Sequence, residues 1–358
     1  MGYDRNDNTR TVMHSTDPEK IRKHRAHALF ISGFVLAAGV VLSLIILFPR
    51  LSRRNQTAEV IAYSDLESLF DIYDNYVMNP HADLSIPTYI TKLDGLYFLV
   101  DCYHNQIIYH DNLTDPLTDW NVMTDEINRG HTIASDGFVY LADDTENNCV
   151  LVFEKQEDIF VHTQTFADIG NRPHYIIYDA PTDTFYAWSS MSGEMYLFRH
   201  DPDESCMYLS EIRSMEQLDN VYVRSFTIMG DEIYFVSGNS SILRADLDTF
   251  ELLETYPVPD SMAGMIQLTK IQDYYYITIS TDITGDQDYA TIVRTRDLSG
   301  LMEGNYEDIY ETFIGGGTPY YITAFDDAFY LTEHRLPGHS VWRFRVQDNE
   351  LTDVETIY

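Results

Sequence analysis

A pattern of aromatic and apolar residues returns six times along this chain of 358 residues. Each copy has a turn residue, an aromatic-rich run, a polar loop, a second apolar run and a charged residue, as in GLYFLVDCYHNQIIYHD from Gly95. The equivalent tyrosines are Tyr97, Tyr140, Tyr186, Tyr234, Tyr276 and Tyr330, at steps of 43, 46, 48, 42 and 54 residues. Strand-forming repeats with such a period are typical of propeller blades. We therefore predict an all-β fold, a six-bladed β-propeller of four-stranded blades.

A second feature is the uncharged apolar segment at residues 28–48, which is 21 residues long. A helix of this length spans the hydrocarbon core of a bilayer, which is about 30 Å thick. Six Lys or Arg residues precede the segment and three follow it, which favours a cytoplasmic N-terminus. We predict a disordered cytoplasmic tail at 1–27, a transmembrane helix at 28–48 and an extracytoplasmic remainder. A cleaved signal peptide is the alternative, but the apolar run is long and no cleavage motif follows it.

Residues 49–83 are predicted to form a linker and a short juxtamembrane helix, ahead of a propeller at 84–358. Ser64 and Glu67 have the spacing of a capping box at the start of this helix. Apolar residues recur at helical spacing after it, namely Leu66, Leu69, Phe70, Tyr73 and Val77. The six repeats complete the ring without exchanging a strand, and a closing strand near Val60 is an alternative.

Charge is unevenly distributed, although the whole chain carries a formal charge of −34. Residues 55–358 contain 14 Lys or Arg and 53 Asp or Glu, a net charge of −39. Such an acidic body repels phosphate backbones, so nucleic acid is not an expected partner. The three cysteines form no CxxC motif, which argues against a zinc ribbon or a disulfide framework. A pairing of Cys102 with Cys149, in neighbouring repeats, stays open.

Two segments resemble the core of an NHL repeat: Asp-Gly-Leu-Tyr-Phe-Leu-Val-Asp at 94–101 and Asp-Gly-Phe-Val-Tyr-Leu-Ala-Asp at 136–143. The layout of residues 84–358 is similar to the six-bladed propellers of the NHL-repeat, strictosidine-synthase-like and gluconolactonase groups. The resemblance implies the fold, but no single reaction, because propellers carry many unrelated functions. The inner strand at 89–93 lacks the glutamate that the gluconolactonase type places there, so a lactonase is not predicted.

Candidate ligand-binding residues lie where the loops leading into the inner strands meet the mouth of the central channel. These residues are His131, His174, Arg172, Arg224 and Tyr321, together with His334 and Arg335 from the loop at 333–340. Guanidinium groups hold carboxylate or sulfate, and imidazoles bind Zn²⁺ or transfer protons at neutral pH. The resemblance to NHL-type lyases likewise implies metal-binding histidines on separate blades. No catalytic residue is assigned.

Two loops between second and third strands offer oxygen ligands for Ca²⁺. The weak metal candidates are His131, His174, Asp143, Asp144, Asp286 and Asp288. Neither acidic loop has the spacing of a calcium-binding loop, and solvated turn residues are the simpler interpretation. No cofactor is identified from the sequence, with Ca²⁺ or Zn²⁺ as open alternatives.

Three functions follow from these observations. The first is a membrane-anchored, extracytoplasmic module that binds a small molecule, a glycan or a protein at the channel mouth. The second is a metal-dependent lyase or hydrolase that uses the same mouth. The third is a structural subunit of an envelope complex, which predicts a large apolar patch on the outer face of one blade.

Overall fold

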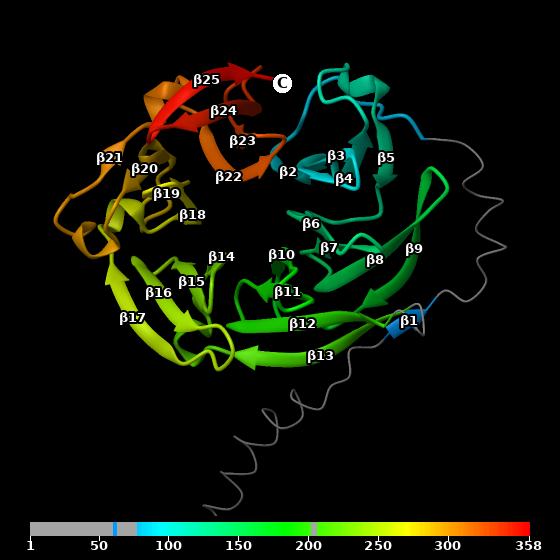
Figure 1. Cartoon of the computed structure of the whole chain (residues 1–358), viewed down its shortest axis with the longest axis horizontal. Helices are drawn as coiled ribbons and strands as arrows, with labels where there is room; N and C mark the ends of the chain where they lie inside the picture. The colour runs from blue at the N-terminus through cyan, green and yellow to red at the C-terminus, as the bar shows by residue number, and fades with distance from the viewer. Residues whose placement is uncertain (1–59, 63–76, 202–205) are drawn as a thin grey trace, which may run out of the picture. The chain divides into compact units, whose positions relative to one another are not determined.

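The computed structural model describes residues 60–62, 77–201 and 206–358, which form six antiparallel sheets around a central axis (Figure 1). Each sheet contains four strands that are consecutive in the sequence and are ordered from the axis outward, and one sheet carries residues 60–62 as a fifth strand on its outer edge. The described part of the chain is therefore a six-bladed β-propeller of four-stranded blades, as the repeats predict.

Blade 1 contains β2 (Pro87–Leu93), β3 (Leu96–Asp101), β4 (Gln106–His110) and β5 (Asn121–Thr124). Blade 2 contains β6 (Ile133–Ser135), β7 (Val139–Asp144), β8 (Cys149–Gln156) and β9 (Ile159–Phe166). Blade 3 contains β10 (Pro173–Asp179), β11 (Thr184–Ser189), β12 (Glu194–Asp201) and β13 (Cys206–Ser214).

Blade 4 contains β14 (Val223–Met229), β15 (Glu232–Ser237), β16 (Ser241–Asp246) and β17 (Leu252–Pro257). Blade 5 contains β18 (Met265–Ile271), β19 (Tyr274–Ile279), β20 (Thr291–Thr295) and β21 (Glu307–Asp308). Blade 6 contains β22 (Thr318–Phe325), β23 (Ala328–His334), β24 (Val341–Gln347) and β25 (Glu350–Thr356).

Short 3-10 helices lie in the described connections between strands. They are η1 (Cys102–His104), η2 (Leu117–Asp119), η3 (Glu216–Leu218), η4 (Asp260–Met262), η5 (Gln287–Tyr289), η6 (Leu298–Gly300) and η7 (Tyr310–Phe313).

The second strand of each blade carries most of the repeated aromatic pattern because blades pack on both of its faces. All six residues of β7 and of β11 are buried. Between blades 1 and 2, the rings of Phe98 and Phe160 meet edge to face with centroids 5.5 Å apart. Such runs of aromatic and β-branched residues suit a strand that is buried on both faces. The repeat seen in the sequence is therefore the repeat of the contacts between blades.

Tight turns join first to second strands and fix the register of each blade. In blade 1, Asp94 and Gly95 have φ angles of 50° and 84° between the paired residues Leu93 and Leu96. Two consecutive positive φ angles define the mirror-image turn that matches the twist of a hairpin. The Asp-Gly signal in the sequence therefore marks a blade hairpin.

Side chains, not a shared strand, join blade 6 to blade 1. The hydroxyl of Thr332 donates to the carbonyl of Thr88 at 2.7 Å, and that of Thr323 donates to Ile90 at 2.6 Å. An ion pair between Lys92 and Asp326, 2.6 Å long, lies at the same junction. The expectation that no strand is exchanged is confirmed.

The alternative of a closing strand near Val60 is wrong. Residues Val60–Ala62 form β1, which pairs antiparallel with β9 on the outer edge of blade 2. They make a fifth strand of that blade and take no part in joining blade 6 to blade 1.

The predicted tail at 1–27, the transmembrane helix at 28–48 and most of the segment at 49–83 lie outside the described residues. Val77 and Met78, at the end of the predicted juxtamembrane helix, are described and run along β5, where the N–H of Val122 donates to the carbonyl of Val77 at 2.7 Å. Within 60–62, 77–201 and 206–358, no helix has the length and apolar character needed to cross a membrane.

Candidate functional site

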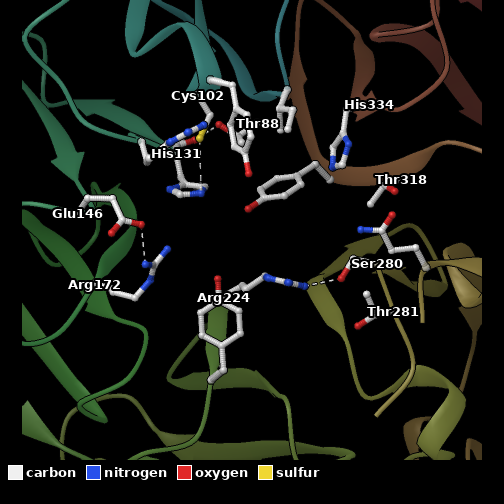
Figure 2. A pocket seen from close by; sticks show the side chains of 16 residues that line it. Thr88, Cys102, His131, Glu146, Arg172, Arg224, Ser280, Thr281, Thr318 and His334 are labelled. Carbon is white, nitrogen blue, oxygen red and sulfur yellow. Dashed lines mark hydrogen bonds and ion pairs between the residues drawn. The ribbon is translucent and has the colours of Figure 1, made fainter. Parts of the chain in front are cut away.

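A cavity of about 420 Å³ opens at one end of the ring, where the loops leading into inner strands meet the loops between second and third strands (Figure 2). Blades 1 to 3 line it with Ile86, Thr88, Cys102, Tyr103, Arg129, His131, Glu146 and Arg172. Blades 4 to 6 line it with Tyr222, Arg224, Ser280, Thr281, Gln287, Thr318, Tyr320 and His334. The cavity therefore lies at the position expected for the channel mouth.

Two arginines are placed by the same device in successive blades. Arg129 and Arg172 have φ angles of 60° and 64°, a region that residues other than glycine rarely adopt. The side-chain oxygen of Asn105 accepts from the N–H of Arg129 at 3.2 Å, and that of Asn148 accepts from the N–H of Arg172 at 2.8 Å. Each blade thus fixes the loop of the next blade, and both guanidinium groups start from a defined backbone.

Asp143 is a fully buried carboxylate that fixes the loop of His131. It accepts from the N–H groups of His131 and Thr132, at 3.0 and 2.7 Å. It also accepts from the hydroxyls of Thr132 and Thr145, both at 2.8 Å. Four hydrogen bonds satisfy a carboxylate, so Asp143 orders the loop and does not face the cavity as a free metal ligand.

His131 and His174 lie together, with ring centroids 3.6 Å apart and planes 24° from parallel. The nitrogens of His131 contact the hydroxyl of Thr145 at 2.9 Å and the sulfur of Cys102 at 3.9 Å. Those of His174 contact the hydroxyls of Tyr222 at 3.2 Å and Tyr321 at 3.3 Å. Since the rings are stacked and their nitrogens are occupied, the pair does not converge on one metal ion.

The remaining acidic candidates have local partners. Asp144 accepts from the N–H of Asn128 at 3.0 Å, and burial raises its pKa. Asp286 and Asp288 are exposed, and the carboxylate of Asp286 caps η5 by accepting from the N–H of Asp288 at 3.0 Å. Across the described ranges, no three His, Cys, Asp or Glu side chains form a group suited to a metal ion.

The cysteines offer neither a disulfide nor an activated nucleophile at this site. No bond joins Cys102 to Cys149, whose thiol donates to the carbonyl of Asn147 at 3.2 Å. Burial, with the nearby charge of Asp143, raises the pKa of Cys102 to about 12. The thiol beside His131 is therefore protonated at neutral pH and is a poor nucleophile.

Tyrosines fill the axis below the cavity. The rings of Tyr89, Tyr175 and Tyr321, from blades 1, 3 and 6, are in mutual contact, with centroids 5.0 to 6.5 Å apart. Burial raises the pKa of Tyr175 to about 12, so its hydroxyl stays protonated. Contact across the axis closes the channel at this level and makes the mouth a cavity with a floor.

Tyr321 lies in this floor, although the sequence placed it at the mouth. It is fully buried, and Tyr320 lines the cavity in its place. The pairing of β22 with β23 shifts register between Pro319 and Ile322. A one-residue shift exchanges the two faces of a strand, so the expected side chain turned into the core.

The first half of the rim, defined as Tyr103, Arg129, Glu146 and Arg172, pairs its cations locally. Arg172 forms an ion pair of 2.6 Å with Glu146. The guanidinium of Arg129 lies 3.6 Å from the centre of the Tyr103 ring. Figure 2 shows Glu146 and Arg172 facing each other on one side of the cavity. Sequence reasoning missed Arg129, which occupies the position of Arg172 one repeat earlier.

The second half of the rim is defined as Arg224, Ser280, Thr281, Thr318, His334 and Arg335. Its cations contact hydroxyl and carbonyl groups, and the guanidinium of Arg224 also lies 4.9 Å from the centre of the Tyr222 ring. Arg224 donates from Nη1 to the hydroxyl of Ser280 and to the carbonyl of Gly264, at 3.3 Å for the latter. Arg335 donates from Nη1 to the hydroxyl of Thr318 and to the carbonyl of Gln287, both at 3.2 Å. Neither arginine forms an ion pair with an acidic side chain of the described residues.

His334 lines the cavity on the same half of the rim. Burial, together with the guanidinium groups of Arg335 and Arg224, lowers the pKa of His334 to about 4. The imidazole is therefore neutral at physiological pH, with one nitrogen as donor and one as acceptor. Arg335 is exposed and does not line the cavity, but it borders the cavity through its hydrogen bonds to Thr318 and Gln287, which do line it.

The fold and this mouth define the class of the protein as a six-bladed propeller with a polar, cationic cavity on its axis. No protein-family model matches the chain, and no curated protein matches it. A solved structure provisionally assigned as a 6-phosphogluconolactonase from Bacteroides uniformis is similar, with 13% identity, a TM-score of 0.54, and coverage of 78% of this chain and 88% of that one.

A second solved structure with the same provisional assignment comes from Bacteroides fragilis. It has 10% identity and a TM-score of 0.55, and covers 77% of this chain and 85% of its own. Both are similar to this chain at the level of fold, in agreement with the gluconolactonase-type layout inferred from the repeats. Neither is an NHL-repeat protein by its name.

Proposed function

We propose that this propeller is a binding module for a small anionic molecule, which it holds in the cavity at the channel mouth. The observation that carries the proposal is Arg224, a half-buried guanidinium with no acidic partner in the described chain. Residues 55–358 contain 53 acidic side chains against 14 basic ones. Arg224 lacks a counter-ion although the body is rich in carboxylates and its guanidinium lines the cavity, and an anionic ligand supplies the missing charge.

Composition of the lining supports the same conclusion. Three arginines line the cavity and only one acidic side chain, Glu146, does so. Negative potential from the acidic body disfavours anions in general. A cationic cavity within this acidic body selects ligands whose charge complements the arginines that line it. A neutral or cationic ligand would leave Arg224 without a counter-charge.

We further propose that the module is anchored in the membrane by residues 28–48, with a cytoplasmic N-terminus. The uncharged run of 21 residues and the basic residues ahead of it support this. In this arrangement the propeller meets extracytoplasmic small molecules or the charged groups of glycans.

Calorimetric titration of the full-length chain in detergent tests the binding function. With benzoate, phenyl phosphate and phenyl sulfate as probes, we expect at least one anion to bind and phenol not to bind. The variant Arg224→Met should weaken binding about 100-fold, whereas Arg345→Met, which breaks the exposed pair with Asp353 on the outside of blade 6, leaves it unchanged. Absence of binding for every anion at millimolar concentration contradicts the proposal.

A hydrolase acting on an anionic ester or lactone is the second candidate, because the two similar solved structures are provisionally assigned as 6-phosphogluconolactonases. Neutral His334 would take a proton from the attacking water and return it to the departing alkoxide. A base with a pKa near 4 is weak at neutral pH, which is why binding ranks first. Release of acid from phosphorylated lactones by the wild type, and none by His334→Gln, would favour the hydrolase.

A further inference from the structure

We infer that the group bound by the second half of the rim is a tetrahedral oxyanion at the end of an organic molecule, a phosphoryl or sulfuryl ester. This inference rests on the proposed function and names the ligand class and its place in the cavity. It starts from the positions of donors contributed by blades 4, 5 and 6.

Arg224 lines the cavity, and the exposed Arg335 borders it through hydrogen bonds to two lining residues. Each makes its described hydrogen bonds through Nη1, to Ser280 and Gly264 in one case and to Thr318 and Gln287 in the other. A guanidinium carries five N–H donors and no acceptor, in a planar fork that suits phosphoryl oxygens. No carboxylate belongs to the second half of the rim, so the forks meet no competing acceptor of full charge there.

Hydroxyl groups add donors from other directions. The oxygen of Thr318 accepts from Arg335, which leaves its hydrogen free to be donated. The hydroxyl of Thr281 lines the cavity and makes no hydrogen bond within the described residues. Ser280 has another role, since it accepts from Arg224 and donates to the carbonyl of Gly264 at 2.9 Å. It therefore orients the guanidinium.

These donors come from three different blades, which favours a tetrahedral group over a planar carboxylate. A carboxylate presents two oxygens in one plane, whereas a phosphoryl or sulfuryl group presents three oxygens in different directions. Figure 2 shows Arg224 directed toward Ser280, away from the Arg172–Glu146 pair. Two guanidinium charges also match the charge of a phosphate monoester, about −1.5 to −2 at pH 7, better than the single charge of a sulfate ester.

Packing around the second half of the rim fixes its geometry before a ligand binds. A Cβ on Gly264 would lie 2.2 Å from the hydroxyl oxygen of Thr281, so only glycine lets the blade 5 loops approach this closely. Next to His334, the carboxylate of Glu333 is fully buried and accepts from Tyr310 at 2.7 Å and from Trp342 at 3.0 Å. The loop that carries His334 and Arg335 is therefore anchored at its start, as a preorganised site requires.

Ligands that share one phenyl frame test the inference by calorimetry on the full-length chain in detergent. We expect phenyl phosphate to bind tightest, phenyl sulfate more weakly, and benzoate at least about 10-fold more weakly than phenyl phosphate. Removing one hydroxyl, in Thr281→Val or Thr318→Val, should weaken phenyl phosphate about 10-fold and benzoate less than about 2-fold. Thr352→Val, on the outer strand of blade 6, is the matched control and should change neither affinity.

The outcomes separate this inference from the proposed function. Benzoate binding as tightly as phenyl phosphate, or equal losses for both ligands in the two valine variants, overturns the tetrahedral oxyanion but leaves an anion-binding module. No binding of any of the three anions overturns both. Should Thr318→Val fail to fold, Thr281→Val still decides, because its half-buried side chain has no described hydrogen bond to lose. Tighter phenyl sulfate than phenyl phosphate would identify a sulfate ester as the ligand.

Discussion

The two halves of the cavity rim differ in whether an arginine has a carboxylate partner. In the first half, Arg172 pairs with Glu146 and Arg129 stacks on Tyr103. In the second half, Arg224 also stacks on a tyrosine, Tyr222, but neither Arg224 nor Arg335 has a carboxylate partner among the described residues. A cation that already has a partner gains little from a ligand, whereas one without a counter-charge gains most. Whether an arginine at the cavity binds a ligand therefore depends on which side chains already contact its guanidinium group.

The largest expected difference between the halves is in the affinity for phenyl phosphate. We expect Arg224→Met to weaken it about 100-fold, because a half-buried, charge-assisted contact is lost. Arg172→Met should weaken it no more than about 3-fold, because Glu146 already neutralises that guanidinium. Calorimetric titration of both variants provides the measurement, and equal losses would erase the distinction between the halves.

The glycines that hold the two halves give the next largest effect. Alanine at Gly264 meets the backbone oxygen of Thr281 at 2.6 Å, and alanine at Gly130 meets that of Asp143 at 2.9 Å. Each variant should lose about 1–3 kcal/mol of stability through overpacking, measured by urea unfolding. Only Gly264→Ala should also weaken phenyl phosphate. A binding loss in Gly130→Ala alone would move the anion site to the first half.

His334, in the second half, should contribute a pH dependence of stability beside that of His174, whose pKa burial also lowers. The pKa of His334 is about 4 in the folded chain against about 6.5 when unfolded. The unfolded state therefore takes up a proton between these values while the folded state does not, so stability falls as pH falls from 6.5 toward 4. Wild type should lose about 1–2 kcal/mol more than His334→Gln between pH 7 and 5, measured by urea unfolding. Parallel curves for the two proteins would contradict the burial of a neutral imidazole.

The smallest expected effect is an increase in the affinity for phenyl phosphate. Glu146→Gln removes the counter-charge of Arg172 and should tighten phenyl phosphate about 2- to 5-fold, since exposed ion pairs are worth up to about 1 kcal/mol. Glu355→Gln breaks the comparable exposed pair with Arg343 on the outside of blade 6 and should leave affinity unchanged. Weaker binding in Glu146→Gln would show that Glu146 itself contacts the ligand.

The blades were predictable from sequence because the same contacts recur in each of them. A tyrosine-centred run buried between two blades, followed by a loop and a second run, gives a signal at every repeat. The proximity of His131 and His174 was predictable for the same reason, since both occupy the same position in adjacent blades. Arg129 could have been found by the same comparison with Arg172.

The burial of Tyr321 could also have been found by comparing repeats. Tyr321 occupies the position of Tyr89 and Tyr175, and the register shift beside it recurs in blades 1, 3, 4 and 5. The role of Asp143 was hidden, because an acidic loop does not reveal which carboxylate turns inward to accept backbone N–H groups. Arg224 and Arg335, which both belong to the second half of the rim, come from blades 4 and 6 and are more than 100 residues apart in the sequence.

Closure of the ring by side chains has a mechanical consequence. Because no strand of the described residues crosses from blade 6 to blade 1, their junction is a seam held by side-chain hydrogen bonds such as that from Thr332 to Thr88. The cavity straddles this seam, with Thr88 on one side and Thr318 on the other. A ligand that contacts both sides would stabilise the junction and would slow amide hydrogen exchange in β2 and β22 more than in blade 3. Ligand binding in the cavity would thereby stabilise the junction between blades 1 and 6 without a conformational change of the propeller.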